Sequence, residues 1–383
     1  MNNVFKFIVF FLFFTKLFQY VDFNIKSSVL TLALACFVGL EFKKKNEFSF
    51  LIKLFVCCIF FSCISSYIYR DQTNLFTTFT QCYFYLSLAF YFVCSWLKIK
   101  IYELEKSLVL VGFISIGAYF LQNAVYPTVI FADATNDYSS ELRIRMCGSL
   151  IYSFLFFFGI NRYVINKSLK YLLCSVLAFI CIIIMGFRSL TVSLLALGAL
   201  EYFYVSGVSV KRLKQLLPLI LIVIVVSQID IVQNKVAEML ARQERGDSFD
   251  NSDYIRFVEF DYYWNYYFKD SYERFFGSGL PVQGTAFYNL EMKNFSYNLF
   301  WNDWGLLGMS WIFGIPTVII LYFMYIKVIV SKLPKEYTYL KAIFAFLILT
   351  SLTSAEAFRP GNLLLQGAFL YLVMSIKNSI KQI

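Results

Sequence analysis

Residues 253–268 read DYIRFVEFDYYWNYYF, inside the one long stretch, from Val232 to Leu299, that is compatible with water. This stretch of roughly 65 residues has no transmembrane pattern, whereas the chain on both sides of it reads as one apolar helix after another. A water-compatible segment of that length, placed late in an apolar chain, predicts a folded unit held over a bilayer. The flanking helices would then be its scaffold.

The composition excludes a water-soluble core. Of 383 residues, 59% are hydrophobic and 15% are charged, and the mean hydropathy is +0.65. Such values are typical of an integral membrane protein. A bilayer admits only helices or a closed barrel, and continuous rather than alternating apolarity favours helices. The predicted fold class is an all-α polytopic membrane protein with about 12 transmembrane helices and one long, partly helical periplasmic loop.

The predicted regions are residues 1–231 with helices 1–9, residues 232–298 as the long loop, and residues 299–383 with helices 10–12. Residues 170–206 as a single helix would reach ~55 Å, against a hydrocarbon core of ~30 Å, so the chain must turn at Gly186–Ser189. Arg188 is then the tip of an outer hairpin. The expected helices lie near 4–21, 27–42, 48–69, 75–97, 107–126, 149–164, 169–186, 190–206, 216–232, 299–326, 339–356 and 361–376.

The net charge is +10, and the distribution of the positive residues predicts how the chain is oriented in the membrane. No nucleic-acid partner is expected. With the amino terminus inside, the cytoplasmic short loops collect 19 Lys and Arg residues and the outer short loops six. Because positively charged short loops stay on the cytoplasmic side, both termini are predicted to be cytoplasmic and the long loop to face outward.

No metal and no cofactor are expected. The nine cysteines all lie between Cys36 and Cys181, mostly in apolar segments where thiols pack as small apolar side chains. The long loop has none, so no disulfide is expected in it. The chain has no histidine and no metal-like cluster of acids, which argues against a zinc site.

Outer-side arginines are the leading candidates for ligand contact. Arg188 sits between two membrane-buried helices, where a guanidinium needs an anionic partner from the protein or a ligand, with a lipid headgroup as the alternative. Arg143 and Arg145 precede the sixth helix on the same side, and interface anchoring is the alternative for either one. Arg242 and Arg245 lie in the polar opening of the long loop.

The long loop is predicted to contain a helix from Ser252, a candidate N-cap, to about Lys269. Its aromatic side chains are too many for one face, so we expect them to contact membrane, other helices or a sugar. Gly277-Ser278-Gly279 is predicted to be a tight turn whose backbone N–H groups form a candidate anion cradle. Glu356 and Arg359, three residues apart, can simply pair with each other.

Three stretches, covering under a fifth of the chain, form a pattern in the predicted topology. They are Phe187-Arg188-Ser189-Leu190-Thr191 at the hairpin, Arg256 and Phe276-Gly277-Ser278-Gly279 within Asp253–Gly279, and Tyr297-Asn298-Leu299 before Gly305-Leu306-Leu307-Gly308. They look like the Ser-Arg-Ser hairpin, the arginine-helix-Gly-x-Gly sequence and the His-Asn and Gly-hydrophobic-hydrophobic-Gly motifs of the O-antigen polymerase and ligase superfamily. The chain thus resembles its Wzy-type polymerases. It departs at Tyr297, where many ligases have histidine.

The resemblance implies a metal-independent glycosyltransferase of the bacterial inner membrane, which polymerises lipid-linked oligosaccharide repeat units at the outer, periplasmic face. Glycan passes from one undecaprenyl pyrophosphate carrier to the terminal sugar of another, giving O-antigen or a related surface polysaccharide. The two carriers are the expected partners, and the resemblance admits a chain-length regulator protein as another. Arginine suits the leaving pyrophosphate because its fixed fork of donors stabilises developing charge without a metal.

We expect the catalytic residues to be Arg188, Arg256, Asp253 and Asp303. A base for the acceptor hydroxyl must be a carboxylate or a tyrosine, because histidine is absent. The carboxylate candidates are Asp253, Glu259, Asp303 and Glu356. The expected substrate-binding residues are Arg143, Arg145, Arg242, Arg245, Tyr297, Asn298, Glu356 and Arg359.

Two other functions share most of these features. A flippase or transporter of lipid-linked oligosaccharide suits a basic protein with twelve helices, but it needs no outer segment of this length and usually carries more charge inside the bundle. An O-antigen ligase shares the fold and the motifs. Product length separates them: after gene deletion, single repeat units indicate a polymerase, whereas loss of all surface glycan indicates a flippase or a ligase.

Overall fold

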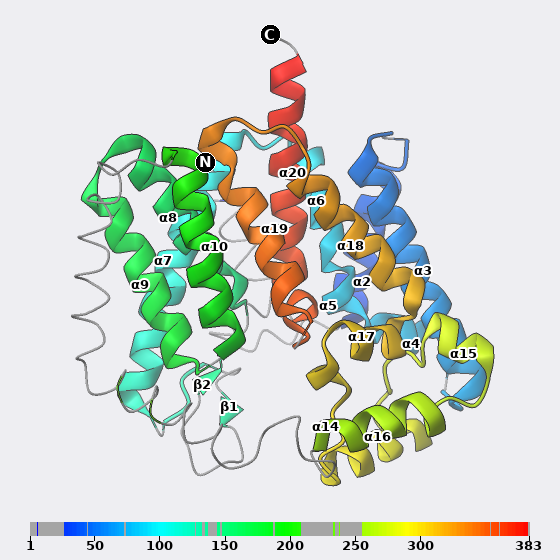
Figure 1. The fold of residues 1–383 in the computed structure, drawn as a ribbon. Helices are drawn as coiled ribbons and strands as arrows, with labels where there is room; N and C mark the ends of the chain where they lie inside the picture. The colour runs from blue at the N-terminus through cyan, green and yellow to red at the C-terminus, as the bar shows by residue number, and fades with distance from the viewer. Residues whose placement is uncertain are drawn as a thin grey trace.

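The computed structural model describes residues 6, 27–43, 45–72, 74–126, 128–131, 135–136, 144–145, 148–186, 188–207, 233, 237, 255–352, 354–359 and 361–381. Within these ranges almost every element is a helix (Figure 1). The exception is one short antiparallel pair, β1 (Thr135–Asn136) and β2 (Ile144–Arg145), in which Thr135 lies opposite Arg145. The all-α part of the predicted fold class is confirmed.

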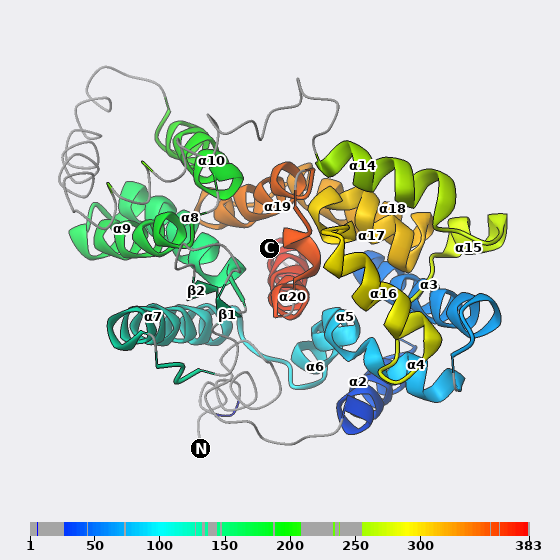
Figure 2. The ribbon, with the colours of Figure 1, turned by 90° about the horizontal axis from the view of Figure 1, so that it is seen from below.

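The helices form two groups about a central one. Viewed from below, α20 stands in the centre, with α7–α10 on one side of it and α2–α6 and α14–α18 on the other (Figure 2). In chain order, the helices before the long loop are α2 (Ser27–Leu40), α3 (Glu47–Tyr69), α4 (Leu75–Gln81), α5 (Tyr83–Leu86), η1 (Ser87–Ala89), α6 (Phe90–Trp96), α7 (Ile101–Val125), α8 (Leu150–Asn166), α9 (Leu169–Ile184) and α10 (Arg188–Ser206). The helices from residue 255 onward are α14 (Ile255–Asp261), η3 (Tyr262–Tyr266), α15 (Ser271–Phe276), α16 (Ala286–Ser296), η4 (Trp301–Trp304), α17 (Leu306–Phe313), α18 (Ile315–Ile329), η5 (Lys335–Tyr337), α19 (Tyr339–Thr350), η6 (Glu356–Phe358) and α20 (Asn362–Lys381).

Exposed apolar side chains form a stripe along at least one helix. Among the described residues four helices, α3, α7, α10 and α20, are long and apolar enough to cross a membrane. The shorter α18 and its last turn expose Ile315, Ile319, Phe323, Ile326 and Val330, each between 40% and 71% exposed. Residues three or four apart share one helix face. An apolar face that is open along its whole length fits contact with lipid, and the chain is an all-α protein of membrane character.

Two expected helices are interrupted. The segment 75–97 is divided into α4, α5, η1 and α6, and the segment 299–326 into η4, α17 and α18. The second prediction failed because Gly305 and Gly314 take φ values of +48° and +85°, which a helix does not allow. The expected helix 339–356 ends at Thr350. The expected helices 4–21, apart from Lys6, and 216–232 lie outside the described residues, so the total of twelve stays a prediction.

The predicted hairpin between residues 170 and 206 is confirmed, whereas its outer location stays a prediction. Helix α9 ends at Ile184 and α10 begins at Arg188, with Gly186 at a φ of +73° between them. Glycine adopts this left-handed conformation without the penalty that a Cβ atom brings. The chain therefore reverses where the length of the apolar segment required it to.

The described part of the long loop, together with the start of the next helices, forms a unit with an aromatic core, called here the loop unit (residues 255–313). Tyr263 stacks on Trp311, with ring centroids 4.9 Å apart and an interplanar angle of 11°. The expected single helix ending near Lys269 is wrong in detail: α14 passes into the π-helix η3, in which Tyr267 N–H donates to Tyr262 O at 3.0 Å. Ser252 lies outside the described residues. The buried core consists of Tyr263, Tyr267, Phe287, Leu299 and Trp311.

Within this unit a glycine strap, Gly277–Gly279, fastens the segment after α15 to α17. The backbone N–H groups of Ser278 and Gly279 donate to the carbonyls of Trp311 and Ile312, both at 2.8 Å, and Gly277 N–H donates to Glu273 O at 2.7 Å. These donors are already used, so the prediction of an anion cradle is wrong. Gly277 has a φ of +89°, and a Cβ atom there would lie 2.3 Å from the Ile312 oxygen.

Gly277→Ala should destabilise the protein, because the residue would carry a left-handed backbone costing ~1–2 kcal/mol in addition to the steric clash with Ile312. The matched control is Gly117→Ala on α7, where a Cβ atom would meet nothing within 4 Å. Thermal unfolding of both variants in detergent measures the difference. Equal melting temperatures would contradict the proposed role of the strap.

Candidate functional site

Predicted site residues from separate segments gather toward one end of the helix bundle. The helices α14, α15 and α16 lie at that end, and α10 begins on the same side (Figure 1). Arg188 is the first residue of α10. The pair Glu356 and Arg359 precedes α20, and Arg256 and Asp303 belong to the loop unit.

Arg256, Glu259 and Asp303 form one charged cluster. Arg256 and Glu259 are three residues apart on α14 and share a face. The Glu259 side chain is fully buried, and its Oε1 accepts a hydrogen bond of 3.0 Å from the backbone N–H of Phe300. This bond holds the chain before η4 against α14. Asp303, on η4, is thereby brought close enough for its charge to act on Glu259.

The protonation of Glu259 follows from its surroundings. Burial, reinforced by the neighbouring Asp303 carboxylate, raises the pKa of Glu259 to about 7. The Phe300 N–H, the Arg256 guanidinium and the Trp304 indole act in the opposite direction. Removing a carboxylate from water disfavours its charged form, and a second negative charge does the same. Near neutral pH this carboxyl can therefore gain or lose a proton.

The second cluster surrounds Glu356, which is 1% exposed. Ser149 Oγ donates to Glu356 Oε1, and Asn362 Nδ2 donates to the same oxygen at 3.0 Å. Arg359 Nε lies 3.0 Å from Glu356 Oε2, which confirms that these two residues can pair. Asn362 also accepts a hydrogen bond of 3.0 Å from Leu150 N–H. The cluster thus joins α8 to the start of α20, and 27% of the Arg359 side chain stays exposed.

The two clusters belong to neighbouring segments of the chain. Leu306 N–H donates to Ser351 O at 2.8 Å. A side chain on Gly305 would meet that same oxygen at 2.3 Å, so the close approach requires glycine. The residues after Asp303 therefore lie against the segment that leads into Glu356.

Arg188 differs from the other arginines at this end of the bundle. It is half-buried, and it makes no ion pair with any residue that the structure describes. A guanidinium at the membrane surface without a protein partner is available to an external anion or a lipid headgroup. The structure leaves these two alternatives from the sequence open.

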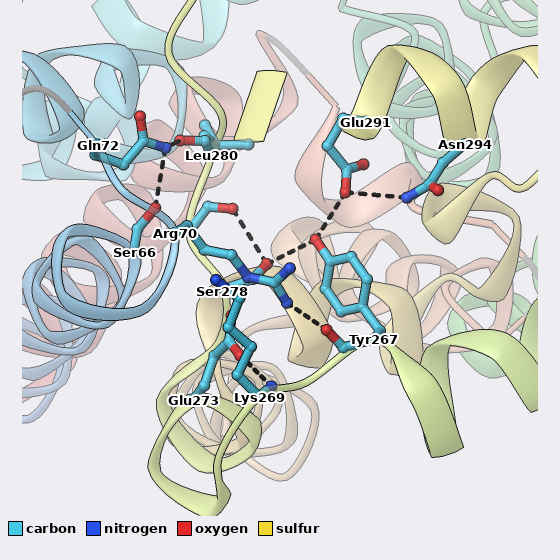
Figure 3. Close-up of polar contacts among 11 residues, drawn as sticks. Ser66, Arg70, Gln72, Tyr267, Lys269, Glu273, Ser278, Leu280, Glu291 and Asn294 are labelled. Carbon is cyan, nitrogen blue, oxygen red and sulfur yellow. Dashed lines mark hydrogen bonds and ion pairs between the residues drawn. The ribbon is translucent and has the colours of Figure 1, made fainter. Parts of the chain in front are cut away.

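A buried network around Arg70 was not predicted as a site (Figure 3). The Arg70 guanidinium pairs with Glu273, donates to the carbonyl of Tyr267, and lies 4.3 Å from the Tyr267 ring centroid. Tyr267 OH in turn donates to Glu291 at 2.8 Å and contacts Ser278 Oγ at 3.1 Å. The sequence shows Arg70 only as a cation at a helix end, and nothing in it indicates a partner 203 residues away.

Other predicted site residues are not brought into these clusters. Tyr297 is 62% exposed at the end of α16, and Asn298 is exposed with a left-handed φ of +58° that ends the helix. These two residues therefore end helix α16 and are not part of the cluster around Glu259. Five predicted residues lie outside the described residues or, for Arg145, are described in the backbone alone: Asp253, Arg143, Arg145, Arg242 and Arg245.

The described part of the chain contains no group of three or more His, Cys, Asp or Glu residues placed to hold a metal ion. No family model, no curated protein and no solved structure matches the chain.

Arg70→Met should lower the free energy of unfolding by about 3–5 kcal/mol, because it leaves Glu273 buried without its partner. The control is Lys327→Met, whose partner Glu47 has a side chain 31% exposed; such exposed pairs contribute ~0–1 kcal/mol. Melting in detergent measures both changes. A smaller loss for Arg70→Met than for Lys327→Met would refute the anchoring role.

Glu259→Gln should change how stability depends on pH. The folded protein holds this proton more tightly than the unfolded chain, so its stability is expected to fall as pH rises from about 4.5 to about 7. The glutamine variant keeps an acceptor for Phe300 N–H and should lose this fall. Parallel pH-melting curves for the two proteins would contradict the raised pKa.

Proposed function

We propose that the protein polymerises lipid-linked oligosaccharide repeat units. In this proposal it transfers glycan from one undecaprenyl pyrophosphate carrier to the terminal sugar of another, as a metal-independent glycosyltransferase making O-antigen or a related surface polysaccharide. The resemblance of the Arg188, Arg256 and Tyr297–Gly308 segments to the Wzy-type polymerases motivates the reaction.

One observation carries the proposal: the loop unit holds Arg256 beside two carboxyl groups, at an end of the bundle where Arg188 also lies. Transfer from a pyrophosphate carrier needs cations for the leaving group, and it benefits from a carboxylate near the reacting sugar. An apolar helix bundle below such groups suits a substrate whose other end is a hydrocarbon chain. The carrier's isoprenoid tail would lie between the helices or against their lipid-facing stripes.

In the proposed reaction, the acceptor hydroxyl attacks the anomeric carbon of the donor sugar and gives up its proton to one of the candidate carboxylates. The bond from that carbon to the pyrophosphate oxygen breaks, and undecaprenyl pyrophosphate leaves with the electron pair. Arg188 and Arg256 stabilise the charge that develops on the leaving group. Asp303 and Glu356 line the same end of the bundle, where Arg359 is already neutralised by Glu356.

We further propose that the chain has about twelve spans in the bacterial inner membrane, with both termini cytoplasmic and residues 232–298 in the periplasm. The positive-inside pattern of the short loops supports this orientation. Glu47, at the start of α3, pairs with Lys327 and Lys377, while Arg70 and the loop unit lie beyond the other end of that helix. A chain-length regulator protein is a further proposed partner.

Arg188→Ala and Arg256→Ala should each abolish long-chain surface glycan and leave product of one repeat unit, because the leaving pyrophosphate loses a charge partner. Gel analysis of surface glycan from complemented null strains measures this. Arg274→Ala is the control: this exposed arginine of the loop unit donates to Trp264 O at 2.8 Å and should keep the ladder.

The null strain itself discriminates among functions. Accumulation of one-unit product fits a polymerase, whereas complete loss of surface glycan would favour the flippase or ligase alternatives. Ladders of normal length from both arginine variants, with the proteins inserted at normal levels, would remove the case for these arginines.

A further inference from the structure

Residues 270–282 run along α3 in one direction and then return. At the end of α3, Tyr69 OH donates to Asp270 Oδ1 at 3.4 Å. The ring centroid of Phe276, six residues later, lies 5.3 Å from that of Phe61, which is eight residues back along α3. At 1.5 Å per residue, the chain has therefore moved ~12 Å along the helix. Figure 1 and Figure 2 both show the connecting helix α15 beside α3.

The second half of this segment returns to the same end of α3. Gly279 lies against the helix one turn before its end, where a Cβ atom on the glycine would lie 2.6 Å from Ser66 Cβ. Beyond the end of α3, Gln72 Nε2 donates to Leu280 O at 3.1 Å, and Gln72 Oε1 accepts from Val282 N–H at 3.3 Å. The segment thus arrives and leaves at one end of the helix, which is the course of a hairpin.

Helix α3 gives the depth of this hairpin in a bilayer. It is one of the helices that are long and apolar enough to cross a membrane. Its first residue, Glu47, pairs with Lys327 and Lys377, and such a charged cluster belongs at the edge of the hydrocarbon. Phe61 is 14 residues further along the helix, or ~21 Å, whereas the hydrocarbon core is ~30 Å thick. The turn of the hairpin at Phe276 therefore lies at the level of the hydrocarbon.

The surface around this turn is apolar. Helix α3 exposes side chains that are spaced four or seven residues apart and share one face: Phe50, Leu54, Phe61 and Ile68. Phe275 is 48% exposed, and its ring centroid lies 5.0 Å from that of Phe276, which packs on Phe61. The exposed guanidinium of Arg274 donates to Trp264 O at 2.8 Å, as a long cationic side chain does when it reaches a polar partner from an apolar surface. Phe275 thus extends the exposed stripe of α3.

The backbone of the turn meets the condition that a bilayer imposes. Irregular backbone is tolerated at membrane depth only where the protein itself satisfies its polar groups. Gly277 N–H donates to Glu273 O, and the N–H groups of Ser278 and Gly279 donate to carbonyls of α17. The three strap residues are buried, and the buried Glu273 carboxylate is paired with Arg70. These donors need no water, so the turn can lie among acyl chains.

We propose that residues 271–280 form a re-entrant hairpin. It enters the bilayer leaflet at the Tyr69 end of α3, turns at Phe276 and leaves on the same side. Its partner is the acyl chains of that leaflet, which Phe275 contacts. The proposal does not depend on the proposed reaction. It refines the proposed location of residues 232–298, because this part of the long loop lies in lipid and fastens the loop unit to the bilayer in addition to the Arg70–Glu273 pair.

The test uses the full-length protein in nanodiscs of phosphatidylcholine and phosphatidylglycerol, in which both bilayer surfaces are open to water. A water-soluble maleimide is added to Phe275→Cys, and peptide mass spectrometry follows that one cysteine, so the native cysteines do not interfere. Phe275→Cys should react at least ~10-fold more slowly than Met292→Cys, because maleimide attacks the thiolate, which forms in water and not among acyl chains.

Met292→Cys is the matched control for exposure within the loop unit. Met292 is 39% exposed, compared with 48% for Phe275, and its helix α16 lies farther from the bundle than α15 does (Figure 1). Ile319→Cys, on the exposed apolar stripe of α18, gives the rate of a site covered by lipid. After denaturation in SDS, all three cysteines should react at the same rate.

A second measurement identifies the partner. When p-benzoylphenylalanine replaces Phe275, irradiation should attach the protein to nanodisc lipid, whereas the same replacement of Met292 should not. These defined lipids contain no polyprenyl carrier, so attachment identifies the acyl chains of the bilayer. This measurement also decides the matter if Phe275→Cys does not fold.

The hairpin and the proposed reaction can fail separately. Equal labelling rates for Phe275→Cys and Met292→Cys in nanodiscs, or no lipid attachment at Phe275, would overturn the re-entrant hairpin and leave the proposed reaction as it stands. Slow labelling and lipid attachment in a protein that forms no polymer would support the hairpin and overturn the proposed function alone.

Discussion

A guanidinium buried at the end of α3 holds the loop unit in place. Arg70 pairs with Glu273, which lies 203 residues further along the chain, and donates to a carbonyl of the same unit. Removing these charges from water costs several kcal/mol per ion, so the arrangement is stable only while both partners are present. The unit therefore has a fixed position on the bundle, and Arg256 and Asp303 depend on that position.

Glycine makes the other half of this junction possible. Gly277 and Gly314 let the strap after α15 lie directly against the end of α17, at distances that a Cβ atom would prevent. The same backbone geometry interrupts the apolar segment that follows the loop. Because the chain turns at Gly305 and Gly314, η4, which contains Asp303, packs against α14 instead of continuing a membrane helix.

The sequence alone was sufficient where one strong physical constraint acted. The hairpin before Arg188 follows from the thickness of a bilayer, and the pairing of Glu356 with Arg359 follows from helical spacing. Residue spacing did not predict the contacts that depend on segments far apart in the chain. The sequence predicts free N–H groups around Ser278, but these groups donate to carbonyls of α17. The sequence also does not indicate that the aromatic run forms a core with Trp311.

The sequence by itself determined that this chain is helical, apolar and interrupted by one water-compatible unit, because apolar length and charge are local properties that a bilayer selects directly. Only the tertiary structure decided which charges meet. It buried Glu259 beside Asp303, fastened Arg70 to Glu273, and left Tyr297 on the surface. These outcomes depend on contacts between segments far apart in the chain, and the energy of a buried charge is fixed by its neighbours in space rather than in sequence.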